Sequence, residues 1–244
     1  MSSPIPIRLP IRLLIHGASG RMGQALIRLA AQSPDLCVVA AVSRQQTSAQ
    51  NVPWFASSAL AEVPAFDVAI DFSLPSGVPG IVELCRSRGA ALVCGTTGLD
   101  DSQRALLADA ANAIAVLWAA NFSIGIAVLS ELVRQAAAAL PGWDCDVIEA
   151  HHTRKLDAPS GTALALGAAA AEGRGSDPHY CSIRAGDIVG EHTVMLTAAG
   201  ERLELVHRAS NRDVFALGAL HAARRLAVAP AGNHDLASLL FARL

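Results

Sequence analysis

Two adjacent histidines and a lysine stand just ahead of a turn that opens a helical run. The stretch of residues 149–162 supplies His151, His152 and Lys155, and then Ser160, Gly161 and Thr162. A histidine changes charge near neutral pH and can move a proton, while a lysine adds a positive charge. Where a helix begins, its first backbone N–H groups have no partner inside the helix and attract an anion. The stretch therefore predicts a receptor for a carboxylate or phosphate with a proton carrier beside it. The simpler alternative is a solvated loop with incidental charges.

A glycine-rich turn lies near the beginning of the chain, between a short apolar strand and a helical pattern. The strand covers residues 11–16, and the turn reads Gly17-Ala18-Ser19-Gly20-Arg21-Met22-Gly23. Strand, glycine turn and helix in this order are typical of a site for a dinucleotide pyrophosphate, because glycines permit a tight turn and close approach of the backbone. The spacing G-x-x-G-x-x-G is a variant of the commoner G-x-G-x-x-G, so the prediction depends mainly on the flanking strand and helix. We expect a dinucleotide cofactor here.

The residues after the second predicted strand bear on the choice of cofactor. That strand covers residues 37–42 and ends at Ser43 and Arg44, where an NAD-selective site places an acid that accepts hydrogen bonds from the ribose. A neutral Ser43 removes the repulsion of a 2′-phosphate, and the guanidinium of Arg44 can pair with that phosphate. The alternative is an Arg44 that only points to solvent. In either case we expect NADPH to be used at least as well as NADH.

Strands and helices alternate through the first half of the chain. Further strands are predicted over residues 68–72, 91–94 and 115–118, and helices over residues 58–62, 78–88 and 101–111. This alternation predicts an α/β fold with a Rossmann-type doubly wound parallel sheet, which binds ligands at the carboxyl ends of its strands. Each turn alone is typical of an ordinary loop, but one bound cofactor explains why four meet at this edge. They are Gly17–Gly23, Phe72-Ser73, Gly95–Gly98 and Ala119–Ser123.

After Ser123 the pattern changes to longer strands with few crossovers. Helices are predicted over residues 124–140 and 162–172, the second ended by Gly173, and strands over residues 143–150, 181–184, 191–196 and 202–207. A long helix over residues 213–228 and a terminal helix over residues 234–244 complete the chain. The sequence thus predicts a second, smaller α+β region with a mixed sheet.

Composition argues against several other classes of protein. The 244 residues carry a net charge of −2 and no basic block, which disfavours a nucleic-acid or membrane-surface partner. No apolar run reaches the roughly 18 residues of a membrane span. Residues 1–10 contain prolines and predict a floppy leader, not a signal peptide. The cysteines are expected to be buried small hydrophobes in a reducing cytoplasm, without a metal. They are Cys37, Cys85, Cys94, Cys145 and Cys181.

Several short segments spread along the chain form a family pattern. They are Gly-Ala-Ser-Gly-Arg-Met-Gly, Asp-Phe-Ser, Gly-Thr-Thr-Gly, Ala-Asn-Phe-Ser, Glu-Ala-His-His with Lys-Leu-Asp-Ala-Pro-Ser-Gly-Thr-Ala, and Arg-Ala-Gly-Asp-Ile-Val-Gly-Glu-His. Together they resemble the dihydrodipicolinate reductases, now called 4-hydroxy-tetrahydrodipicolinate reductases, of the diaminopimelate–lysine pathway. The resemblance extends from Ile11 to about Leu220.

The resemblance implies NAD(P)H-dependent reduction of (2S,4S)-4-hydroxy-2,3,4,5-tetrahydrodipicolinate to 2,3,4,5-tetrahydrodipicolinate. His151 corresponds to the family's proton donor and acceptor, and Lys155 to its second proton donor. The small dicarboxylate substrate would be contacted by His152, Lys155, Ser160, Gly161 and Thr162. The residues implied for NADPH or NADH binding are Gly17, Ala18, Ser19, Gly20, Arg21, Met22, Ser43, Arg44, Phe72, Gly95, Thr96, Thr97, Ala119, Ala120, Asn121 and Phe122.

The resemblance also implies a cytoplasmic homotetramer. Residues 1–122 and 210–244 would form the dinucleotide-binding domain, and residues 123–209 the substrate-binding and oligomerisation domain. The chain departs from the family in three places: Ser43 stands where many members have an acid, the segment after Arg44 is trimmed, and the link to Cys181 is short.

Two other functions stay open. A related dinucleotide-dependent dehydrogenase acting on aspartate or an aspartate-derived aldehyde would share the predicted cofactor domain. A cofactor-sensing regulator without turnover would share it too, but has no use for the His-His-x-x-Lys set. Turnover of the hydroxy-tetrahydrodipicolinate distinguishes these functions.

Overall fold

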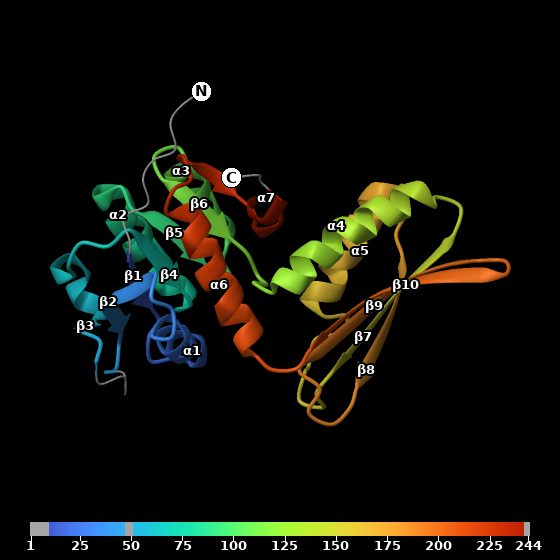
Figure 1. Ribbon diagram of the computed structural model, residues 1–244, viewed down its shortest axis with the longest axis horizontal. Helices are drawn as coiled ribbons and strands as arrows, with labels where there is room; N and C mark the ends of the chain where they lie inside the picture. Colours follow the sequence, from blue (N-terminus) through green and yellow to red (C-terminus); the bar gives the residue numbers. More distant parts are fainter. Residues whose placement is uncertain (1–9, 47–50, 242–244) are drawn as a thin grey trace. The chain divides into compact units, whose positions relative to one another are not determined.

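The computed structural model describes residues 10–46 and 51–241, and the chain divides into two compact units (Figure 1). One unit comprises the chain up to Phe122 and again from Phe215, and the other comprises Ser123–Val214. The described residues exclude nearly all of the predicted leader, part of the segment after Arg44, and the last three residues of the predicted terminal helix. Within the described ranges, no helix is both long enough and apolar enough to span a membrane.

The first unit contains the doubly wound parallel sheet that the alternating pattern predicts. Among the described residues its seven strands lie in the order β11-β6-β5-β4-β1-β2-β3, and all neighbours are parallel. The connections reverse direction between β1 and β4, and such a switch point opens a crevice at the carboxyl ends of the strands. The strands are β1 (Ile11–His16), β2 (Leu36–Ser43), β3 (Trp54–Ala56), β4 (Val68–Asp71), β5 (Ala91–Cys94), β6 (Ala115–Trp118) and β11 (Gly232–His234).

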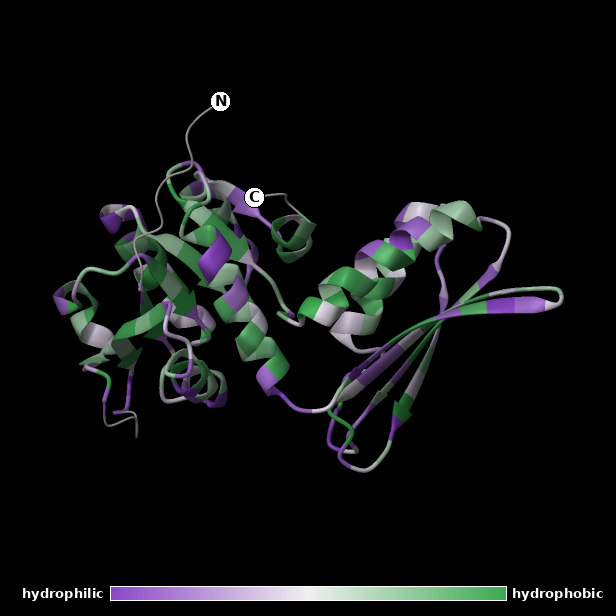
Figure 2. Ribbon diagram, viewed as in Figure 1, coloured by the Kyte–Doolittle hydropathy of each residue, from purple (hydrophilic) through white to green (hydrophobic). Residues whose placement is uncertain are grey.

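Helices pack against this sheet, so its central strands are mostly apolar and largely buried. Strands β4 and β5 are buried at every position, as expected for parallel strands covered on both faces. The strands of this unit are mostly hydrophobic in Figure 2. The helical segments are α1 (Arg21–Ala30), α2 (Val78–Arg88), α3 (Asp101–Ala110), α6 (Asp213–Leu226) and α7 (Leu236–Phe241), with the 3₁₀ turns η1 (Ser57–Glu62) and η2 (Pro75–Gly77).

The second unit packs α4 (Ile124–Ala139) and α5 (Gly161–Arg174) side by side on one face of a mixed sheet (Figure 1). The strand order in the described chain is β10-β9-β7-β8, with β7 parallel to β8 and antiparallel to β9. Alternate residues of β7 are buried toward the helices, and because strand side chains alternate, Glu149 and His151 share that inner face. The strands are β7 (Asp144–His151), β8 (His179–Arg184), β9 (Gly190–Ala198) and β10 (Glu201–Ala209).

The structure corrects the predicted ends of two helices. Helix α3 begins at Asp101 and ends at Ala110, one residue before the predicted end. Asp100 caps it, because the Asp100 side chain accepts from the Gln103 N–H and the Gln103 side chain accepts from the Asp100 N–H. Helix α5 passes through Gly173 and ends at Arg174, with Gly175, at a φ of 79°, as its C-cap. Gly173 lies where α4 comes close, since a Cβ there would be 2.3 Å from the Arg134 carbonyl oxygen.

Other differences concern short strands and the cysteines. The three-residue strands β3 and β11 were not predicted, and they pair with β2 and β6. Cys37 and Cys181 are exposed, contrary to the expectation of burial, because each lies at an outward position of its strand. The remaining cysteines are buried as expected, and they are Cys85, Cys94 and Cys145.

Candidate active site

The carboxyl edge of the seven-stranded sheet contains a pocket of about 430 Å³. Gly17 has a φ of 80°, and a Cβ there would lie 2.4 Å from the Phe72 carbonyl oxygen, so only glycine lets β1 and β4 approach this closely. Gly20 is the N-cap residue of α1, whose first turn carries no acidic side chain. A helix start without acids attracts the anionic groups of a dinucleotide, so the pocket fits that cofactor. Of the predicted cofactor residues, those lining it are Gly17, Ser19, Gly20, Ser43, Arg44 and Phe72.

The serine that replaces the expected acid is already hydrogen-bonded within the protein. The Ser43 hydroxyl donates to the Gln45 carbonyl oxygen at 2.6 Å and accepts from Trp54 Nε1 at 3.1 Å. Its neighbour Arg44 is exposed and lines the same pocket. The pocket therefore presents a guanidinium next to the end of β2, near the position where an NAD-selective site has a carboxylate.

A buried carboxylate beneath the pocket holds three strand ends together. Asp71 Oδ1 lies 2.8 Å from His16 Nδ1 and accepts from the Ser73 N–H, while Oδ2 accepts from the Thr96 hydroxyl at 2.7 Å. Burial alone would raise the pKa of Asp71, but the contacts with His16, Ser73 and Thr96 lower it below its usual value. The ionised carboxylate thus ties the ends of β1, β4 and β5, a role that the sequence did not reveal.

The other predicted cofactor residues belong to the same edge but do not line the pocket. Ala18, Thr96 and Phe122 are buried, and the Phe122 ring packs edge-on against Phe72 with 5.5 Å between ring centroids. The others are exposed or half-buried, and they are Arg21, Met22, Gly95, Thr97, Ala119, Ala120 and Asn121.

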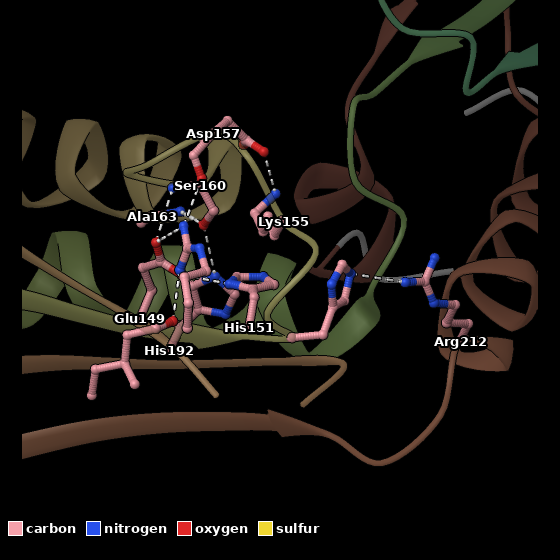
Figure 3. A network of polar contacts seen from close by, with 11 residues as sticks. Glu149, His151, Lys155, Asp157, Ser160, Ala163, His192 and Arg212 are labelled. Carbon is pink, nitrogen blue, oxygen red and sulfur yellow. Dashed lines mark hydrogen bonds and ion pairs between the residues drawn. The ribbon is translucent and has the colours of Figure 1, made fainter. Parts of the chain in front are cut away.

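In the second unit, His151 is buried at the end of β7 and contacts Glu149 through Nδ1 (Figure 3). Glu149 is only 1% exposed and accepts from Arg184 through both carboxylate oxygens, at 2.9 and 2.8 Å. Burial alone would raise the pKa of Glu149, but hydrogen bonds from Arg184, Ser182 and His151 lower it to about 2. A fully ionised carboxylate therefore lies against His151.

The adjacent histidine lies in a different environment. His152 Nε2 is 3.3 Å from Arg212 Nη2 (Figure 3). Burial, together with the nearby cations Arg154 and Arg212, lowers the pKa of His152. A neutral imidazole can accept a hydrogen bond, so this pair is suited to binding rather than to donating a proton. The structure thus separates two histidines that the sequence analysis considered together as proton carriers.

The loop between β7 and α5 carries the predicted cation. Lys155 Nζ lies 2.9 Å from Asp157 Oδ1, and the Lys155 side chain is 21% exposed. An ammonium paired with an exposed carboxylate can exchange that partner for a ligand carboxylate at small cost, because such surface pairs contribute little.

Ser160 is a structural residue at the start of α5. Its hydroxyl accepts from the Ala163 N–H at 3.1 Å and lies 3.2 Å from His192 Nε2, while its own N–H donates to Glu149. The Ser160 N–H is therefore not available to an anion, contrary to the sequence-based expectation. Gly161, which is exposed, and Thr162, which is half-buried, begin the helix where an anion can be received.

Sequence reasoning missed four residues of this network: Glu149, Arg184, His192 and Arg212. One signal was available for Glu149, since residues two apart on a strand share a face and Glu149 precedes His151 by two. Arg184 and His192 belong to a segment that was noticed only for its family pattern.

Comparison with known proteins identifies the family. Residues 11–122 match the family model for the dihydrodipicolinate reductase N-terminus, and residues 125–240 match the model for its C-terminus. The 4-hydroxy-tetrahydrodipicolinate reductase of Xanthomonas axonopodis pv. citri (strain 306) is 62% identical over 94% of this chain and 98% of its own length. That of Stenotrophomonas maltophilia (strain R551-3) is 61% identical over 95% and 98%. A dipicolinate-bound dihydrodipicolinate reductase from Paenisporosarcina sp. TG-14 shares the fold, with a TM-score of 0.81 at 24% identity over 95% of this chain and 99% of that chain. The chain therefore belongs to the dihydrodipicolinate reductase family.

Proposed function

We infer that the chain catalyses the NAD(P)H-dependent reduction of (2S,4S)-4-hydroxy-2,3,4,5-tetrahydrodipicolinate to 2,3,4,5-tetrahydrodipicolinate in diaminopimelate and lysine biosynthesis. The observation that carries this inference is identity above 60% to reductases over almost the whole chain. These relatives give no support to the alternative of a dehydrogenase acting on aspartate or an aspartate-derived aldehyde.

The reaction replaces a hydroxyl group by hydrogen, so a hydride and a proton enter and one water leaves. A bound nicotinamide dinucleotide supplies the hydride. We assign delivery of this proton to His151, with Lys155 as the second donor, and to Lys155 also the charge that holds a substrate carboxylate. The start of α5 at Gly161 and Thr162, with His152 opposite Arg212, would orient the dicarboxylate ring.

An assay with freshly generated substrate tests this function. Dihydrodipicolinate synthase would produce the substrate in place, and the loss of reduced cofactor absorbance would be followed with NADPH and with NADH. Oxidation that requires both the synthase and this chain supports the reductase. Absence of that oxidation, together with turnover of aspartate and an oxidised cofactor, would overturn it.

Flat dicarboxylates are expected to inhibit competitively. Pyridine-2,6-dicarboxylate presents two carboxylates on a planar ring, as the substrate does, and should compete with it. Replacing Thr162 with valine removes one hydroxyl donor and should weaken this inhibition by about 1 kcal/mol, or roughly fivefold. Inhibition constants for the parent and the variant measure the effect. Pyridine-2-carboxylate is the control, and equal inhibition by this monocarboxylate would contradict a site for two charges.

We propose that NADPH is used at least as well as NADH, because Ser43 leaves no acid at the ribose and Arg44 stands at the pocket. Replacing Arg44 with alanine should raise the KM for NADPH and leave the KM for NADH nearly unchanged. The NADPH preference should weaken as salt rises, since the contact is exposed. Arg86→Ala, which removes an exposed arginine paired with Asp109, is the matched control. Equal effects of Arg44→Ala on both cofactors would exclude a phosphate contact.

We also propose that residues 1–122 and 210–244 bind the dinucleotide, and that residues 123–209 bind substrate and assemble a cytoplasmic homotetramer. The sheet face opposite α4 and α5 supports the assembly, because Ile183 on β8 and Val206 on β10 lie there and are 49% and 39% exposed. Exposed apolar side chains on one sheet face favour a contact with another subunit. The mass of the protein in solution tests this proposal.

A further inference from the structure

The segment from Arg184 to His192 surrounds the Glu149–His151 pair. Arg184 pairs with Glu149 from the end of β8, while Gly190 and His192 approach His151 from β9. None of these three residues has a role in the proposed binding of substrate or cofactor.

Arg184 fixes the position of the buried carboxylate. Its two terminal nitrogens donate to the two oxygens of Glu149 in parallel, the strongest arrangement for such a pair. Arg184 Nη2 also donates to the Asp157 carbonyl oxygen at 2.6 Å. Because the Asp157 side chain contacts Lys155, the same guanidinium connects Glu149 to the loop that carries the catalytic cation.

The charge of Glu149 determines which nitrogen of His151 carries a fixed proton. An ionised carboxylate can only accept hydrogen bonds, so the Nδ1 atom that contacts it must be protonated. Nε2 is then the nitrogen that gains and loses a proton.

Gly190 and His192 keep that second nitrogen accessible and add no charge beside it. A Cβ at Gly190 would lie 3.1 Å from His151 Nε2, so any larger residue would crowd this atom. The His192 ring stands edge-on to His151, with 5.2 Å between ring centroids. Burial lowers the pKa of His192 to about 4, with the nearby charge of His151 as a smaller cause, so His192 stays neutral near pH 7.

We propose that Glu149 is the positioning residue for the proton donor: it holds His151 with its proton on Nδ1 and Nε2 free for transfer, and Arg184 holds Glu149 in place. The inference rests on the proposed function, since it concerns the proton of that reaction. In the step the Nε2–H bond breaks, and the proton bonds to the substrate that has received the hydride. The imidazole is left neutral, with its Nδ1–H still donating to Glu149.

The charges around His151 set the expected pH dependence. The strands contribute Glu149 on β7, Arg184 on β8, His192 on β9, and His207 on β10, which acts on His192. The loop between β7 and α5 contributes His152, Arg154, Lys155 and Asp157. Glu149 is the anion in direct contact with His151, so its loss should destabilise the protonated imidazole.

Glu149→Gln tests the proposal through the rate and its pH dependence. We expect kcat to fall roughly 10–100-fold, because a misplaced proton donor costs about that much, while the KM for substrate changes less than about threefold. The alkaline fall of kcat should move to lower pH, and Glu149→Asp, which keeps the charge, should restore part of the rate. The matched control is Asp67→Asn, which breaks the paired contact with Arg12 in the other unit and should leave the pH profile unchanged. An unchanged kcat and pH profile in folded Glu149→Gln would overturn the proposal.

A second measurement does not depend on turnover. The ¹⁵N shifts of histidine-labelled full-length protein under alkaline conditions report which ring nitrogen carries the proton, and His151→Asn assigns the signal. We expect an Nδ1–H tautomer in the parent chain and its loss in Glu149→Gln. An Nε2–H tautomer in the parent chain would overturn the proposal even if the enzyme is active. If the tautomer is as expected but hydroxy-tetrahydrodipicolinate is not reduced, the positioning role stands and the proposed function fails.

Discussion

Replacing Lys155 with alanine is expected to lower kcat by roughly 10²–10⁴-fold, because the reaction then loses both a proton donor and the cation beside the substrate. The structure adds a second reason. Lys155 Nζ lies 2.9 Å from Asp157 Oδ1, so alanine would leave that carboxylate without this ion-pair partner where two substrate carboxylates are proposed to bind. The KM for substrate should therefore rise while kcat falls. Steady-state kinetics at saturating substrate measures both quantities.

Arg154→Ala is the matched control, since it removes an exposed cation from the same loop without touching the Lys155–Asp157 pair. Its effect on kcat should be small. Near-normal turnover by Lys155→Ala, or an equal loss in Arg154→Ala, would contradict the role given to Lys155.

His151→Ala should lower kcat by a similar 10²–10⁴-fold, the usual scale for general acid catalysis. The KM for substrate should change less than in Lys155→Ala, because Lys155 is the residue proposed to hold a substrate carboxylate, whereas the buried His151 contacts Glu149. His179→Ala removes an exposed histidine from β8 and serves as the control. If both His151→Ala and Lys155→Ala kept normal turnover, the proton assignments would be wrong.

The elements predicted most accurately from the sequence are those marked by both an apolar run and a clear stop. Strands β1 and β5 and helix α2 have the predicted bounds, because Gly or Pro residues flank these apolar runs. Strand β6 also has the predicted bounds, although neither Gly nor Pro flanks it. Strands β3 and β11 are three residues long and carry no alternating pattern of their own. They are strands because β2 and β6 present free edges to them, which local sequence does not encode.

The candidate site was predicted only in part, because local sequence encodes some of its contacts and not others. The residue types and their spacing identified His151 and Lys155 and the turn before α5, since these lie close together in the chain. The partner of Glu149 is Arg184, 35 residues away, and the two meet only because β7 and β8 pair in one register. Ser160, at the start of α5, and His192, on β9, also meet across 32 residues. Contacts that depend on strand register cannot be predicted from the local sequence and are seen only in the folded structure.

The stability of the second unit is expected to fall as pH drops below about 6.5, and His192 is the main reason. His192 is 4% exposed, and burial lowers its pKa from 6.5 to about 4. Because the folded state binds this proton less readily than the unfolded state, the contribution of His192 is complete above pH 6.5 and is lost as pH falls toward 4. A shift of this size corresponds to on the order of 3 kcal/mol. Glu149, whose pKa falls from 4.5 to about 2, acts with the same sign in a lower window.

His192→Gln should flatten this pH dependence, since glutamine can still bond to the Ser160 hydroxyl but cannot bind a proton. The free energy of unfolding would be measured in urea between about pH 4 and pH 7, using Trp143 fluorescence after Trp54 and Trp118 are changed to phenylalanine. Trp143 is half-buried and packs against the core of the second unit, so its signal reports that unit. Part of the slope should remain, because burial also lowers the pKa of His207. His179→Gln is the control, because that imidazole is 87% exposed and should leave the slope unchanged. An identical slope in His192→Gln and the parent chain would show that a buried neutral His192 does not set the acid stability of this unit.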